Sequence, residues 1–316
     1  MNNLSSLVLP YEAIQYTRRK LTARSEKLLE ERLQEAEPTR DMPSLSVRAN
    51  SYETFVEHDV ASYRKLLELV AQIAGLNPQY QLFFRGQTNN WLDGKLVPTL
   101  YSGIWRDPLT SVRLDERRDT LNGAGNELVE RLGDFYGRRS DAKVFLEQLR
   151  RNPLVRWALL QHYGICDTPL LDVTRSLQVA CTFARLGAEH GHGYVYVLAL
   201  PYQREAISID DNEGMTVMSL LGVTPPSARR PLNQDGFLIS TSEWWRYTAD
   251  RSAGDAPHTV DRPNYYKRVM TVFRIPTGDE FYQDSGLSDF GNDWLCPKDD
   301  GFADILFQTG FAPKFW

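Results

Sequence analysis

Two segments of the chain place polar side chains inside, or directly after, apolar stretches. In the first, the short apolar run 81–84 is followed by Arg85, Gly86 and Gln87. The second, residues 157–174, holds four polar side chains among apolar ones: Gln161, His162, Asp172 and Thr174. A polar group buried without a partner costs about 1 to 3 kcal/mol, so a segment that only fills a core has no use for so many. We therefore expect the two segments to face one another across one polar site.

A family pattern runs through both segments. Its first block consists of Phe84, Arg85, Gly86, Gln87, Trp91, Leu96 and Pro98, and its second of residues 161–164, Thr168, residues 170–172, Thr174, Ala180, Phe183 and Ala184. This pattern resembles the FRG domain, which is named for its Phe-Arg-Gly motif. Residues 234–237 and 297–301 are similar to later landmarks of the family, so the resemblance spans about residues 44–301. The resemblance implies that the protein is a component of bacterial or phage conflict and defence systems.

The composition is that of an ordinary globular protein. Among 316 residues, 42% are hydrophobic and 24% charged, and the formal net charge is -5. This net charge provides no overall attraction to nucleic acid or to an anionic membrane, although a local basic groove would be compatible with it. No apolar run is long enough to cross a bilayer, and the N-terminus lacks the basic and apolar regions of a secretory signal. With three scattered cysteines, we expect free thiols in a reducing cytoplasm.

The order of elements predicts an α+β fold, with a mixed or antiparallel sheet flanked by helices. We expect strands at residues 44–48, 81–84, 194–200, 237–239 and 269–275, of which 194–200 is apolar enough to be central. Helices are expected at residues 63–75, 111–151, 153–163 and 175–190. Because helices come mainly first and strands mainly later, a doubly wound parallel sheet is disfavoured.

The first 43 residues differ from the rest in composition. Residues 17–36 are charged, with leucines at helical spacing, and residues 37–43 contain two prolines. We expect an N-terminal helical arm and linker at 1–43, followed by one FRG-like domain at 44–316. The narrow apolar stripe of this helix would pack on the domain or on a protein partner, since such a helix is marginal alone.

Arg85 is the leading candidate for binding an anion. Its planar guanidinium suits phosphate or carboxylate, and Gly86 would let a ligand approach the backbone. The alternative is structural: Asp172 is the leading internal anion, and a closed Arg85–Asp172 pair would leave no ligand site. Gln87, Gln161 and Thr174 are further candidates for contact with a ligand.

His162 has a structural and a catalytic interpretation. As a base, it would be oriented by Asp172 accepting a hydrogen bond from one ring nitrogen. Cys166 lies four positions away, and an inert thiol is the simpler interpretation of it. No spacing of histidines and cysteines matches a metal site, and no glycine-rich loop for a diphosphate is present, so we predict no metal.

Ser240, Thr241 and Ser242 follow an expected strand. A strand that delivers Arg-Gly and a later one that delivers Ser-Thr-Ser are similar to the arginine-serine-glutamate class of ADP-ribosyltransferases. In that class the arginine holds an NAD phosphate and the Ser-Thr-Ser strand shapes the nicotinamide pocket. This resemblance implies NAD as a substrate, with Glu280 as a catalytic carboxylate and Asp299 or Asp300 as alternatives. Ser-Thr-Ser could equally be an ordinary polar strand end.

Two functions remain open from the sequence, and we favour the first because polar groups converge on one place. One is a nucleotide-handling enzyme, with Arg85 clamping phosphate and His162 or a carboxylate assisting. The other is a module that binds an anionic ligand or a protein partner without chemistry.

Overall fold

The computed structural model of the chain describes residues 57–90, 111–137, 139, 142–210, 214–241 and 265–314. The predicted helical arm, the predicted strand 44–48 and Ser242 lie outside these residues. The boundary expected at residue 44 therefore stays a prediction.

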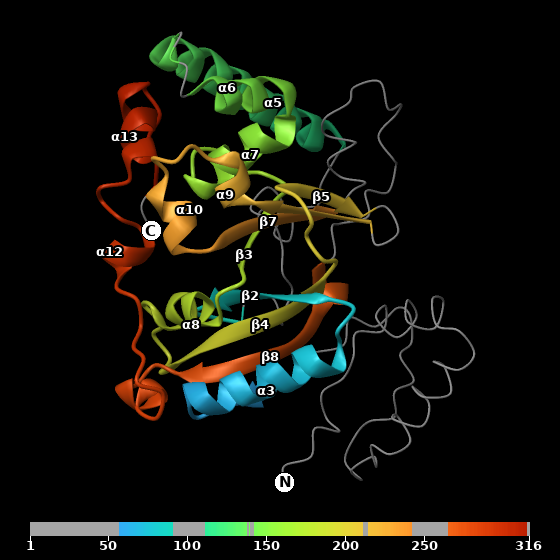
Figure 1. Ribbon diagram of the computed structural model, residues 1–316, viewed down its shortest axis with the longest axis vertical. Helices are drawn as coiled ribbons and strands as arrows, with labels where there is room; N and C mark the ends of the chain where they lie inside the picture. Colours follow the sequence, from blue (N-terminus) through green and yellow to red (C-terminus); the bar gives the residue numbers. More distant parts are fainter. Residues whose placement is uncertain are drawn as a thin grey trace, which may run out of the picture.

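One mixed sheet forms the centre of the described part (Figure 1). Its strands are β1 (Glu57–Asp59), β2 (Gln81–Gln87), β3 (Leu171–Thr174), β4 (His192–Leu200), β5 (Ile207–Asp210), β6 (Met215–Ser219), β7 (Gly236–Thr241) and β8 (Val269–Pro276). They lie in the order β1-β8-β4-β2-β3-β7-β6-β5, with β1 parallel to β8 and every other neighbouring pair antiparallel. The α+β class with a mixed sheet is confirmed.

β4 is a central strand, as its apolar sequence predicts. It pairs with β2 on one side and β8 on the other, and its last six residues are buried. The strands β1, β3, β5 and β6 have no counterpart among the predicted elements. Each contains only three to five residues, which is too short for a periodic pattern to emerge.

Helices cover the two halves of the sheet separately (Figure 1). The half containing β4 and β8 carries α3 (Tyr63–Leu76) and α8 (Leu177–Arg185), and the half containing β3 and β7 lies beside α7 (Pro153–His162) and the helices packed around it. The remaining helices are α5 (Ser111–Tyr136), α6 (Lys143–Arg151), α9 (Leu220–Val223), α10 (Arg229–Asn233), α12 (Asn292–Leu295) and α13 (Gly301–Gln308), with 3₁₀ turns η3 (Tyr265–Arg268) and η4 (Asp279–Tyr282).

Strand parity decides which residues meet the helices. Phe84 packs in one cluster with α3 and α8, whereas its neighbour Phe83 packs on the other face with Tyr196 and Phe237. Arg85 and Gln87 therefore share the face of Phe83, and Gly86 faces α8. A Cβ atom at Gly86 would lie 1.9 Å from the carbonyl oxygen of Ala180 in α8, so only glycine permits this approach.

The two halves of the sheet meet at a narrow joint. β2 and β3 share one register pair, Phe84 with Thr174, whereas β2 and β4 share seven. Pairing between β2 and β3 therefore ends at Phe84, and Arg85 is paired only with Tyr196 of β4. The first polar segment and the second lie side by side at this joint, as expected from the sequence.

Candidate functional site

Arg85 is the cation at the joint between β2 and β3. Its Nη1 donates to the backbone carbonyl of Asp172 at 2.6 Å, and its Nε is buried without a hydrogen-bond partner. It forms no ion pair with any carboxylate in the described part of the chain. Burial lowers the pKa of Arg85, while the Asp172 carboxylate and Tyr196 oppose this shift. The link between Arg85 and Asp172 is thus made through the backbone and not through the carboxylate.

The Asp172 carboxylate faces α7. Its Oδ2 accepts from Gln161 Nε2 at 2.8 Å, and its Oδ1 lies 3.9 Å from His162 Nδ1. Burial alone would raise the pKa of Asp172, but His162, Arg85 and Gln161 outweigh it, so the pKa is lowered. Because 41% of its side chain is exposed, the ionised carboxylate remains reachable from solvent.

Gln161 fixes the position of this carboxylate. Its Nε2 holds Asp172, and its Oε1 accepts from the Thr168 hydroxyl at 2.8 Å. Both ends of the amide are therefore engaged within the protein. This geometry gives Gln161 a positioning duty beside its predicted contact with a ligand.

His162 is sealed from solvent. Its side chain lies at the end of α7 with 3% exposure, and its Nε2 is buried without a partner. Burial lowers its pKa and Arg230 adds to this, whereas Asp172 and Asp300 oppose it. A general base must reach the proton that it removes. The described geometry offers His162 no access to a bound substrate, so it supports a structural role.

Thr174 and Gly86 have structural duties. The Thr174 hydroxyl donates to the carbonyl of Gln234 at 2.7 Å and accepts from the amide of Ser176 at 3.0 Å. Gly86 makes room for the backbone of α8. Both residues were predicted to contact a ligand, but in the structure their contacts are made with the protein itself.

Gln87 lies on the same face of β2 as Arg85. Its register partner in β4 is Tyr194, and that of Arg85 is Tyr196. The Oε1 atom of Gln87 is buried without a hydrogen-bond partner. Two tyrosines, a guanidinium and an amide thus share one patch of the sheet, which we call the β2–β4 face.

The Ser-Thr-Ser segment belongs to another part of the sheet. Ser240 and Thr241 end β7, opposite Thr216 and Met215 of β6. Ser240 is fully buried and its hydroxyl donates to the carbonyl of Thr241 at 3.3 Å. Thr241 Oγ1 is also buried, without a partner, and Ser242 lies outside the described residues. The two described members are therefore not presented to a ligand beside Arg85.

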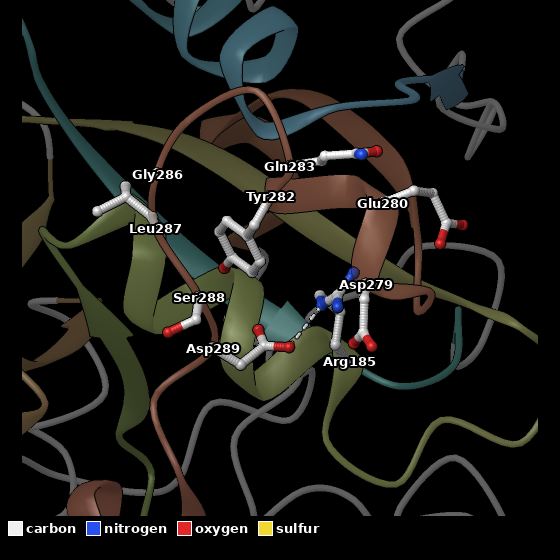
Figure 2. A pocket seen from close by; sticks show the side chains of 9 residues that line it. All are labelled: Arg185, Asp279, Glu280, Tyr282, Gln283, Gly286, Leu287, Ser288 and Asp289. Atoms are coloured by element: carbon white, nitrogen blue, oxygen red, sulfur yellow. Dashed lines mark hydrogen bonds and ion pairs between the residues drawn. The ribbon is translucent and has the colours of Figure 1, made fainter.

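Glu280 lies in a separate pocket beyond the end of β8 (Figure 2). This pocket has a volume of about 670 Å³ and shares no lining residue with the group around Arg85; its lining consists of Arg185, Asp279, Glu280, Tyr282, Gln283, Gly286, Leu287, Ser288 and Asp289. Arg185 is neutralised there by Asp289 at 2.9 Å. The predicted catalytic role of Glu280 thus finds no support in its position.

A buried polar network behind His162 was not predicted from the sequence. Asp300, considered above as a possible catalytic carboxylate, is 1% exposed and caps α13, accepting from the amides of Phe302 and Ala303 at 3.0 and 2.9 Å. It also accepts from the amide of Arg230 at 2.7 Å and from the Tyr163 hydroxyl. An aspartate directly before an apolar helical run is the signal that could have identified this cap.

Within the described ranges, no cluster of three or more histidine, cysteine or acidic residues could hold a metal ion. The three cysteines are free. None of the described helices is long and apolar enough to cross a membrane.

Comparison with known proteins gives one match. Residues 80–192 match the family model described as FRG domain, which covers both polar segments and the β2–β3 joint. Comparisons with curated proteins and with solved structures returned no match.

Proposed function

We propose that this protein, which carries an FRG domain at residues 80–192, binds a nucleotide through Arg85. The observation that carries the proposal is the incomplete pairing of this guanidinium. A cation taken out of water costs several kcal/mol unless an anion and hydrogen bonds compensate it. Arg85 has one backbone carbonyl and an unpartnered Nε, so a bound anion would supply what the described protein lacks.

A phosphate is the anion that this geometry favours. The fork of a guanidinium can donate two parallel hydrogen bonds to phosphate oxygens, and Nη1 is already held in place by the Asp172 carbonyl. Tyr194 on the neighbouring strand is only partly buried and adds aromatic surface that suits a base, whereas Tyr196 is fully buried. Nucleotide binding without chemistry is the function that we favour, because His162 and Ser240 are sealed.

An NAD-consuming enzyme of the ADP-ribosyltransferase type is the second candidate. The specific support for it is Asp172, whose carboxylate is ionised, partly exposed and joined through its own backbone to Arg85. In such a reaction the bond between the ribose carbon and the nicotinamide nitrogen breaks, and the electron pair leaves with nicotinamide. The carboxylate would stabilise the oxocarbenium-like ribose until water or an acceptor attacks and releases its proton to solvent.

The test separates binding from chemistry. Titration calorimetry with NAD, ADP, AMP and inorganic phosphate measures affinity, and mass spectrometry of the same mixtures measures loss of NAD. We expect Arg85→Lys to weaken nucleotide binding by about tenfold to a hundredfold, since a charge-assisted hydrogen bond is worth about 1.5 to 3 kcal/mol.

The matched control is Arg156→Lys. Arg156 also donates to backbone carbonyls, those of Leu149 and Arg150, but it does so away from β2. Unchanged affinity in Arg85→Lys, or no binding of any nucleotide by the folded wild-type protein, would overturn the proposal. Loss of NAD that disappears in Asp172→Asn would favour the enzyme.

We also propose a cytoplasmic setting, where the free thiols stay reduced, and a role in defence against phages. The role in defence rests on the family resemblance. This role predicts that cells expressing the wild-type protein give fewer plaques than cells expressing Arg85→Lys. Equal plaque counts across a phage panel would remove it.

A further inference from the structure

From the β2–β4 face we infer which chemical group the bound nucleotide carries. We infer that the ligand presents an N–H donor, of the carboxamide or exocyclic amine kind, to Gln87 while its anionic group lies on Arg85. This inference rests on the proposed nucleotide binding. It is carried by the buried, unpartnered Oε1 of Gln87, an acceptor that lacks a donor.

The hydroxyl and guanidinium donors that β4 and β8 place on this face are already engaged. The Tyr196 hydroxyl donates to Asn90 Oδ1 at 2.7 Å, and the Tyr194 hydroxyl shares a hydrogen bond with His192 Nε2 at 3.0 Å. On the same face, Arg274 is held by Asp59 through Nη2 at 2.8 Å. Buried acceptors are nearly always satisfied in folded proteins. The missing donor therefore comes from a ligand or from an ordered water molecule.

The spacing of Arg85 and Gln87 along β2 suits one ligand. Arg85 and Gln87 are two residues apart on one strand, so their side chains leave the sheet about 7 Å apart on the same side. A mononucleotide can span that distance, with its phosphate at Arg85 and the polar edge of its base at Gln87. Tyr194, which is only partly buried, stands opposite Gln87 and can support the plane of the base.

The sharpest probes are two mononucleotides that differ only at this group. Nicotinamide mononucleotide ends in a carboxamide, which donates, and nicotinic acid mononucleotide ends in a carboxylate, which only accepts. We expect the amide to bind the wild-type protein about tenfold more tightly, as one net hydrogen bond implies. Adenosine monophosphate and purine riboside monophosphate, which lacks the amine, repeat the comparison for an exocyclic amine.

Gln87→Met removes the acceptor and keeps a side chain of similar length. We expect the preference for the amide to fall to about twofold or less in this variant, while the dependence on Arg85 remains. The control is Gln81→Met on the same face of the same strand, because Gln81 Oε1 is already occupied by the amide of Gln203 at 3.2 Å. This control should keep the full preference.

The outcomes separate the two levels of proposal. If both mononucleotides bind equally and both depend on Arg85, the acceptor holds only water, and the inference is overturned while nucleotide binding stands. Tighter binding of the carboxylate would overturn it as well, because Gln87 would then present its amide nitrogen. If neither probe nor any other nucleotide binds, the proposed function fails.

Discussion

Replacing Gly86 by alanine tests whether this glycine serves the ligand or the fold. The structure places the backbone of α8 directly over it. A Cβ atom there would lie 1.9 Å from the Ala180 carbonyl oxygen and 2.7 Å from the Ala184 amide nitrogen. Real Cβ atoms essentially never approach so closely, so α8 would have to move.

The expected loss of stability is large, because the contacting atoms are backbone. Overpacking a core usually costs about 1 to 3 kcal/mol, when side chains can adjust. Here a whole helix must shift, and α8 buries Ala180, Cys181 and Ala184 against the sheet. We expect Gly86→Ala to lower the free energy of unfolding by about 3 kcal/mol or more.

Urea denaturation followed by circular dichroism measures this loss, with Gly75→Ala as the control. Gly75 lies within α3, and a Cβ atom there would meet nothing within 4 Å. Alanine in a helix is favoured over glycine, so the control should gain about 0.5 to 1 kcal/mol. If Gly86→Ala is as stable as the wild type and only nucleotide binding suffers, the packing explanation is refuted and the glycine serves the ligand.

Three further outcomes follow from the buried polar groups and from one turn. Burial lowers the pKa of His162, so below about pH 6.5 the unfolded chain binds a proton that the folded chain does not, and stability falls as the pH drops. Between pH 7.5 and 5, the urea midpoint of His162→Gln should therefore fall less than that of the wild-type protein. Asp300→Ala removes the acceptor of three backbone amides and should cost about 2 to 4 kcal/mol by urea titration, whereas Asp299→Ala, an exposed neighbour, should cost less than about 0.5. Asp235 has a backbone φ of 40°, which glycine adopts more easily, so Asp235→Gly should leave the melting temperature unchanged or raise it by a degree or two. A clear fall would mean that the exposed ion pair of Asp235 with Arg175 stabilises the fold more than the strained backbone costs.

The fold class was accessible from the sequence because its strongest elements are strongly patterned. The run 194–200 is apolar throughout, and the structure places it between β2 and β8. The apolar run 81–84 was equally visible as a buried strand, which the structure extends through Arg85 to Gln87. Local periodicity reports such features directly, since it depends on neighbouring residues alone.

The sequence could not predict which way the side chains at the site point. Asp172 belongs to β3, a strand of four residues, and a shift of one residue would turn its carboxylate to the other face. The burial of Ser240 depends on its pairing with β6, and the separation of Glu280 depends on where the chain goes after β8. Those facts come from tertiary contacts, which no short window of sequence contains.

The pairing of β1 with β8 has a consequence for how the protein is made. Glu57 lies beside Val272, so an edge of the sheet joins residues that leave the ribosome more than two hundred codons apart. Forming such contacts late exposes the earlier strands during translation, when they can bind chaperones or aggregate. Shortened chains that end before β8 should therefore accumulate in inclusion bodies, even though they contain every residue of the FRG match.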